Sequence, residues 1–379
     1  MSADGVLTGA HESPSRIDVP QLRGIAVLGV VVGHSAAAFT RCAHACNACT
    51  AAAYVDAYAH AAVPLFLIVS GFAVGARYWD ACPVRLFYSR RAARLLPPYI
   101  VASLFYMAVL SPYEGPLSPY LVVPGRLLTG SGYYHLWYVV LILQLYLLAP
   151  VLLRLGQRLD AAGLLECGVC IAFAVQVGHQ LLWPGFLAGV SCGGEGLAAV
   201  AGGLIGWRLF PVGLGYFVLG LWLSRRMRLY SGRDRCARLV ALGVVVAALT
   251  LVVGRLWLQG LAEYGDVHSV QNGGLLIQRV SAETVLHTAA AMFAVVWAGT
   301  RGTDGFVVAR FVRWVGRMSY RLYLLHAAVL VAAQYGLQSM GLTSCNLSYY
   351  VLSITLTLAI SCGLSLLLQR LPGVRLVFG

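Results

Sequence analysis

The chain has 379 residues, of which 59% are hydrophobic and only 11% are charged, and its mean hydropathy is +0.77. A typical soluble domain is about 25% charged, so a water-soluble enzyme and a disordered chain are both excluded. The formal net charge is +13, and all 27 basic residues are Arg. Because these residues fall between apolar runs rather than on one compact domain, they indicate membrane topology and not nucleic-acid binding.

About ten apolar runs recur along the chain, each close to the length of roughly 20 residues that crosses a bilayer. The first 20 residues are polar and lack the apolar segment of a cleavable signal peptide. The sequence therefore predicts an all-α, polytopic membrane helix bundle. The expected spans lie near residues 24–40, 60–79, 95–112, 134–153, 161–182, 205–223, 238–258, 284–300, 316–338 and 348–369.

The Arg distribution sets the expected orientation. If the N-terminus is cytoplasmic, 22 of the 27 Arg residues fall on the cytoplasmic side, which is the bias that membrane proteins show. We therefore expect both termini in the cytoplasm, with tails over residues 1–20 and 371–379 and a membrane domain over residues 21–370. No connection, including the long outer one near 113–133, has room for a separate soluble domain.

The first apolar run carries two ionisable residues, Arg23 and His34. Eleven residues of helix rise about 16 Å, which takes His34 from the inner edge to the middle of a hydrocarbon core about 30 Å thick. Eleven steps of about 100° end roughly 20° beyond three full turns, so both side chains share one helix face. Ionisable groups at this depth are costly and mark functional sites, so we expect this face to point into the bundle.

Two other runs bring polar groups to a similar depth. Ser70 and His326 each lie about ten residues from the nearer end of an apolar run, and Tyr323 precedes His326 by one helical turn. Each has a structural alternative. The Ser70 hydroxyl would otherwise bond to its own helix backbone, and His326 would make a structural hydrogen bond.

A basic cluster, Arg90, Arg91 and Arg94, stands beside Pro97 and Pro98 in the connection between the second and third runs. The alternative reading is anchoring at the cytoplasmic surface. The guanidinium group also suits phosphate recognition, so a phosphorylated cytoplasmic molecule such as coenzyme A would find partners here and at Arg23.

Cysteines and a histidine crowd the expected outer loop between Cys42 and Cys49. The pair of separated CxxC motifs that marks structural zinc is missing. A loop with free thiols, or with a disulfide to Cys192 or Cys345, is the better interpretation. We therefore expect no metal.

Six motifs follow one another in order and together cover roughly residues 18–370. They are Gln21–Ala26 followed by His34, Val63–Phe72, Phe87–Pro97, His135–Tyr138 with Tyr146–Pro150, Tyr216–Gly220, and Gly316–His326. The ordered set resembles the membrane acyltransferase 3 family, bacterial integral-membrane enzymes that O-acylate sugars and other acceptors. One departure is Leu67, where that family often has a second Phe.

This resemblance implies an acyl-CoA-dependent O-acyltransferase in the cell (inner) membrane, with acetyl-CoA as the expected donor and co-substrate. Arg23, Arg90, Arg91 and Arg94 would hold the coenzyme A phosphates. His34 would be the general base, which requires a neutral imidazole, or would carry the acyl group covalently. Ser70, Tyr323 or His326 would steady the oxyanion or orient His34.

The resemblance also implies a carbohydrate or glycoconjugate acceptor that arrives from the outer side. The residues expected to border its entrance are His135, Trp137 and Glu195. Trp137 has an alternative role as an interface anchor, and Glu195 as a solvated loop residue. Two other functions remain open at this stage, acylation of a small glycosylated metabolite and solute transport through a polytopic bundle. The sequence does not determine the oligomeric state.

Overall fold

A computed structural model describes residues 18–36, 55, 59–112, 119–191, 208–226, 244, 284–295, 307–343 and 346–370, with the main chain alone for 119–121 and 183–191. The regular structure of these residues is entirely helical, which confirms the predicted fold class. The labelled helices are α1 (Val19–Ala36), α3 (Ala62–Tyr78), α4 (Val84–Val109), α5 (Pro119–Thr129), α6 (Trp137–Ala161), α7 (Leu165–Ser191), α9 (Pro211–Arg226), α12 (Val307–Arg317), α13 (Ser319–Ser339) and α14 (Leu347–Arg370). A further helix covers Thr284–Val295.

Within the described part of the chain, five helices are long and apolar enough to cross a membrane, namely α1, α4, α6, α7 and α14. The helix α3 and the helix over Thr284–Val295 are apolar but shorter. The protein is therefore a multi-pass membrane protein. The number of ten spans and the cytoplasmic termini stay predictions, and the expected span at 238–258 lies outside the described residues apart from Val244.

The structure differs from the predicted elements at α4. This helix begins at Val84 and not near residue 95, so the basic cluster is helical, and Pro97 and Pro98 lie inside the helix. Pro is tolerated in a bundle where neighbouring side chains satisfy nearby backbone groups. The two prolines remove the helical donors of the Ala93 and Arg94 carbonyls, and in the next position the Tyr320 hydroxyl of α13 donates to the Leu95 carbonyl oxygen at 2.8 Å.

A second difference is α5, which occupies the connection expected near 113–133. It contains Pro124 and is followed by a turn over residues 130–136 that leads directly into α6. We call residues 130–136 the α5–α6 turn. Gly130 in this turn has a φ of 68°, a conformation that Gly adopts without strain.

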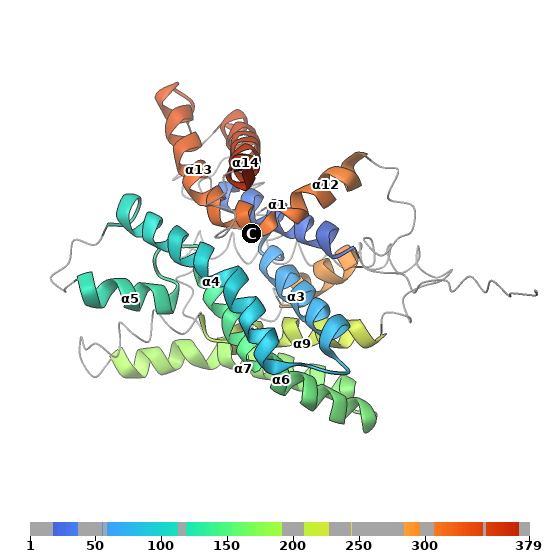
Figure 1. Cartoon of the computed structure of the whole chain (residues 1–379). Helices are drawn as coiled ribbons and strands as arrows, with labels where there is room; N and C mark the ends of the chain where they lie inside the picture. Colours follow the sequence, from blue (N-terminus) through green and yellow to red (C-terminus); the bar gives the residue numbers. More distant parts are fainter. Residues whose placement is uncertain are drawn as a thin grey trace, which may run out of the picture.

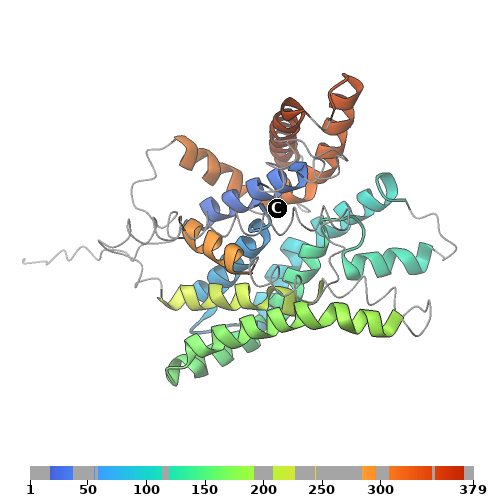
Figure 2. The same cartoon turned by 180° about the vertical axis from the view of Figure 1, so that it is seen from behind.

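The helices form two groups with α3 between them (Figure 1). One group contains α1, α12, α13 and α14, and the other contains α4, α5, α6, α7 and α9; Figure 2 shows the same division from behind. In the first group α1 packs on α12 and α13 packs on α14, while α9 packs on both α3 and α7.

Glycines let two helix pairs approach closely. A Cβ on Gly220 of α9 would lie 2.1 Å from the Ile68 carbonyl oxygen of α3, and one on Gly71 would lie 2.0 Å from the Phe217 carbonyl oxygen of α9. Small residues at such crossings are typical of helix packing in membranes. Gly24 of α1 makes the same kind of contact with the main chain of α12.

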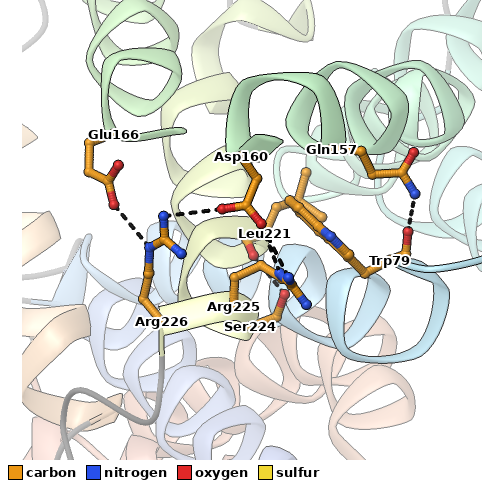
Figure 3. Close-up of polar contacts among 8 residues, drawn as sticks. All are labelled: Trp79, Gln157, Asp160, Glu166, Leu221, Ser224, Arg225 and Arg226. Carbon is orange, nitrogen blue, oxygen red and sulfur yellow. Dashed lines mark hydrogen bonds and ion pairs between the residues drawn. The ribbon is translucent and has the colours of Figure 1, made fainter. Parts of the chain in front are cut away.

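An ion-pair network joins the ends of three helices in the second group (Figure 3). Arg225 and Arg226, at the end of α9, reach the Asp160 carboxylate of α6 at 3.2 and 3.1 Å. Arg226 also pairs with Glu166 of α7 at 3.0 Å. The network fixes the end of α9 against α6 and α7, at the opposite end of α6 from the α5–α6 turn.

Candidate active site

The helix α1 carries both residues that the 11-residue spacing singled out. The Asp18 carboxylate accepts a hydrogen bond from the Gln21 main-chain N–H at 3.1 Å and so caps the start of α1. Asp18 also pairs with Arg313 of α12. Arg23 and His34 are both partly buried, so the face that they share lies against protein, as expected.

Three imidazoles meet in the bundle, and we call them the histidine cluster. The rings of His34 and His326 are stacked, with centroids 5.3 Å apart. His135 meets His326 edge to face at 5.0 Å. The side chains of His135 and His326 are 1% and 0% exposed. The cluster therefore brings together residues from α1, α13 and the α5–α6 turn.

Hydrogen bonds from α13 fix two members of the cluster. His326 Nδ1 lies 2.7 Å from the Tyr323 carbonyl oxygen, and the Tyr323 hydroxyl donates to the His135 carbonyl oxygen. Among the described residues, His326 Nε2 and both ring nitrogens of His135 have no hydrogen-bond partner. Buried polar atoms without partners are rare in folded proteins and are expected where a ligand or water binds.

The described residues contain no group of three or more His, Cys, Asp or Glu side chains that could hold a metal ion. Histidine takes up and releases protons near neutral pH, so the unpartnered ring nitrogens of this cluster are candidates for proton transfer and ligand contact.

Ser70 of α3 is 7% exposed and is hydrogen-bonded to Tyr138 in the first turn of α6. The Tyr138 ring lies 5.6 Å from the Tyr323 ring. Ser70 is thus linked to the histidine cluster through the two tyrosines.

The other polar residue of α1, Arg23, lies among further guanidinium groups. It interacts electrostatically with Arg91 and Arg94 of α4 and with the Tyr138 and Tyr146 hydroxyls of α6. Arg91 is held by Tyr146, whose hydroxyl accepts a hydrogen bond at 3.2 Å and whose ring centroid lies 4.4 Å from the guanidinium carbon. We call Arg23, Arg91 and Arg94 the arginine cluster.

No carboxylate neutralises the arginine cluster within the described part of the chain, where the ion pairs join Asp18, Asp160 and Glu166 to other Arg residues. Like charges held together in this way favour an anionic ligand. Arg321 of α13 interacts electrostatically with Arg94 and extends the cluster to a third helix. Arg90 and Arg94 are both exposed on α4, but Arg90, unlike Arg94, is not among the charges near Arg23.

A family model described as an acyltransferase domain matches residues 17–366, which include every residue of both clusters. The chain belongs to the membrane acyltransferase 3 family. No curated protein and no solved structure gives a match. Family membership supports a transferase of acyl groups, and the apolar helices place this acyltransferase in a membrane.

The remaining predicted residues of the acyltransferase lie at two places. Trp137 is partly exposed and is the first residue of α6, directly after His135. Its Cα would be 2.7 Å from a Cβ on Gly130, so the start of α6 packs tightly on the α5–α6 turn. Glu195 and the segment from Cys42 to Cys49 lie outside the described residues, as do Cys192 and Cys345.

Sequence reasoning missed three aromatic residues of this acyltransferase site. Tyr134 is 47% exposed, and its ring lies 4.9 Å from that of His34. Tyr106 of α4 meets His135 at 5.0 Å, and Tyr138 joins Ser70 to Tyr323. One available signal was the run Tyr133-Tyr134-His135 next to a Gly-containing turn. Arg321 was also missed as a possible ligand contact, because it was counted only toward membrane orientation.

Proposed function

We propose that the acyltransferase moves an acyl group, in particular acetyl, from cytoplasmic acyl-CoA to a hydroxyl of a cell-envelope carbohydrate at the inner membrane. The observation that carries this proposal is the arrangement along α1. The arginine cluster lies near one end of the helix and the histidine cluster near the other, joined by the 11 residues from Arg23 to His34.

The arginine cluster suits the donor. Coenzyme A carries phosphates, which pair with guanidinium groups. From Arg23 to His34 the helix rises about 16 Å, a distance that an extended pantetheine arm can cover. A donor with its phosphates at Arg23, Arg91 and Arg94 would therefore present its thioester to the histidine cluster. Arg90 would contribute less, because it is not among the charges near Arg23.

The histidine cluster suits the chemistry. His34 would remove the proton from the acceptor hydroxyl while its oxygen bonds to the thioester carbonyl carbon. The carbon–sulfur bond then breaks, and coenzyme A leaves as a thiolate that takes up the proton from His34, which regenerates the neutral imidazole. The other two histidines are fixed against this ring, so they would hold it for proton transfer.

The acceptor would reach His34 past Tyr134, since this is the exposed ring in contact with the base. A partly exposed aromatic face suits the apolar face of a sugar ring. Trp137 and His135 lie next to Tyr134 in the chain and would complete the acceptor side, with Glu195 as a further expected contact.

The test is transfer of label from radiolabelled acetyl-CoA into the lipid and macromolecular fractions of membranes. We expect transfer with the wild type and none above background with His34→Ala. Arg23→Ala should raise the KM for acetyl-CoA about tenfold or more, with activity restored at high donor concentration. Removal of one charge-assisted contact of about 1.5–3 kcal/mol gives this size of effect.

Arg85→Ala is the matched control, because Arg85 lies on the same helix as Arg91 but is exposed and outside the arginine cluster. It should leave the KM for acetyl-CoA unchanged. Equal labelling by wild type and His34→Ala would refute His34 as the base. An absence of wild-type transfer to any envelope fraction would refute the proposed acceptor class and leave small-molecule acceptors to be tested next.

A further inference from the structure

We propose that α12 binds anionic phospholipid on its exposed side, with two Arg side chains on the lipid phosphates and apolar side chains among the acyl chains. This surface is separate from the histidine and arginine clusters, so the proposal goes beyond acyl transfer. The surface is formed by Val307, Arg310, Phe311, Trp314 and Arg317, and we call it the α12 face.

The opposite side of α12 is occupied by protein. Val312 and Gly316 are buried against the main chain at the start of α1, where a Cβ on Gly316 would overlap the Pro20 carbonyl oxygen. Next to this buried side, Arg313 pairs with the Asp18 carboxylate, which caps α1. These contacts fix the rotation of α12 about its own axis and therefore determine which residues its free side presents.

The α12 face combines a basic strip with an apolar strip. At about 100° per residue, its five positions fall within an arc of about 120°. Arg310 and Arg317 lie at one edge of this arc, Phe311 lies at the other, and Trp314 lies between them. Val307, Phe311 and Trp314 are 77%, 47% and 36% exposed, and both Arg residues are exposed as well. A helix with this division suits the boundary between lipid headgroups and acyl chains.

The basic strip has no acidic partner in the part of the chain that the structure describes. No Asp or Glu occurs in α12, and Arg310 and Arg317 are absent from the ion pairs of the described residues. A lipid phosphate would supply the missing negative charge, because a guanidinium group binds phosphate through paired N–H donors. Basic residues next to a membrane attract anionic lipids in this way.

The apolar strip indicates that the ligand is a lipid and not a soluble anion. The Phe311 and Trp314 rings lie 6.0 Å apart and form a continuous exposed patch. Trp is enriched where a membrane protein crosses the interface between hydrocarbon and water. A free phosphate would use the two Arg side chains and leave this patch in water, whereas a phospholipid covers both strips.

The position of α12 in the molecule agrees with an interfacial role. It packs beside residues 20–24, at the end of α1 that carries Arg23 and away from His34. Figures 1 and 2 show α12 at the edge of the first helix group, extending away from the bundle. The α12 face is therefore turned away from the interior of a protein that lies in a membrane.

Trp314 allows the lipid next to the α12 face to be identified. The wild type is reconstituted in phosphatidylcholine bilayers that contain a small fraction of brominated lipid, and the Trp314 signal is the difference from Trp314→Phe. We expect brominated phosphatidylglycerol to associate about tenfold more strongly than brominated phosphatidylcholine, because each Arg near an anionic surface strengthens binding about fivefold. High salt should weaken this preference, because it screens exposed charges.

Charge variants test whether the basic strip causes the preference. The double variant Arg310→Gln with Arg317→Gln should be quenched equally by the two brominated lipids. Lys at both positions should retain most of the preference, because it keeps the charge. The matched control is Arg154→Gln with Arg158→Gln, which removes two exposed charges from α6 in the second group. This control should keep the wild-type preference.

Three results would overturn the lipid site. The first is equal quenching of wild-type Trp314 by the two brominated lipids, a comparison that does not depend on the folding of any Arg variant. The second is loss of the preference in both Gln double variants, which would assign it to net charge. The third is an absence of quenching by either lipid, which would mean that protein covers the α12 face. Label transfer tests the proposed function separately from all three.

Discussion

Two tyrosines one turn apart on α13 form hydrogen bonds to main-chain carbonyls, and only one of these bonds reaches the histidine cluster. The Tyr323 hydroxyl donates to the His135 carbonyl oxygen. In Tyr323→Phe this buried carbonyl loses its donor, so we expect the free energy of unfolding to fall by about 1–3 kcal/mol. We also expect kcat to fall at least tenfold, because the turn that carries His135 is no longer fixed. Thermal unfolding in detergent and the label-transfer rate measure the two effects.

Tyr320→Phe is the control for this prediction. Its hydroxyl donates to the Leu95 carbonyl oxygen at 2.8 Å, away from the histidine cluster. We expect a stability loss of similar size, about 1–3 kcal/mol, with kcat close to that of the wild type. If both variants lost the same fraction of kcat, the effect of Tyr323 would be one of general stability and not of positioning.

The sequence allowed some of these residues to be placed and not others. Arg23 and His34 could be put on one face because helical periodicity fixes positions within a single element. The same reasoning cannot say which helices are neighbours. The sequence therefore put Ser70 and His326 at one depth without their contacts, and it could not show that the His135 ring packs against His326 and Tyr323.

At the scale of elements, the crossing of α3 and α9 has no space for a side chain. A Cβ on Gly220 would lie 2.1 Å from the Ile68 carbonyl oxygen, and a backbone atom cannot move aside as a flexible side chain can. We expect Gly220→Ala to lower stability by about 1–3 kcal/mol. It should also lower kcat, because α3 carries Ser70 only two residues after Ile68.

Gly363→Ala on α14 is the matched change, since nothing lies within 4 Å of the added Cβ. Ala is favoured over Gly in a helix by about 1 kcal/mol, so this variant should be as stable as the wild type or more so. A melting temperature for Gly220→Ala equal to that of Gly363→Ala would contradict the close crossing.

The elements that the sequence did not predict are short or polar. The helix α5 has 11 residues, including Pro119 and Pro124, so its apolar run resembles a loop between spans. The helix α12 carries Arg310, Arg313 and Arg317 and lies mostly between the expected spans at 284–300 and 316–338. Its buried residues, among them Val312 and Gly316, recur at helical spacing, and this signal could have identified the helix.

At the scale of the whole molecule, the site lies between the two helix groups seen in Figure 1. His34 and His326 come from the first group, and His135 and Tyr138 from the second. The geometry of the histidine cluster therefore depends on how the groups are joined. Tyrosine hydroxyls connect the two groups. Tyr320 and Tyr323 of α13 donate hydrogen bonds to main-chain carbonyls of the second group, and Tyr106 of α4 donates one to a main-chain carbonyl of α13.

The Tyr106 hydroxyl differs from those of Tyr320 and Tyr323, because it both donates a hydrogen bond to the α13 main chain and accepts one from it. Its hydroxyl donates to the Leu324 carbonyl oxygen at 2.7 Å and accepts from the Ala328 N–H at 3.1 Å. These two backbone groups pair with each other in a regular α-helix, and a side chain inserted between them bends the helix. His326 lies midway between Leu324 and Ala328, so the inserted hydroxyl sets where its ring is directed.

We therefore expect Tyr106→Phe to behave differently from Tyr320→Phe. Without the hydroxyl, the Leu324 carbonyl and the Ala328 N–H can bond to each other, so stability should change by less than about 1 kcal/mol. The turn of α13 around His326 would close, and kcat should fall at least tenfold because His326 shifts against His34. The same unfolding and label-transfer assays decide between the outcomes. A stability loss as large as that of Tyr320→Phe, with kcat retained, would mean that Tyr106 only fastens α4 to α13.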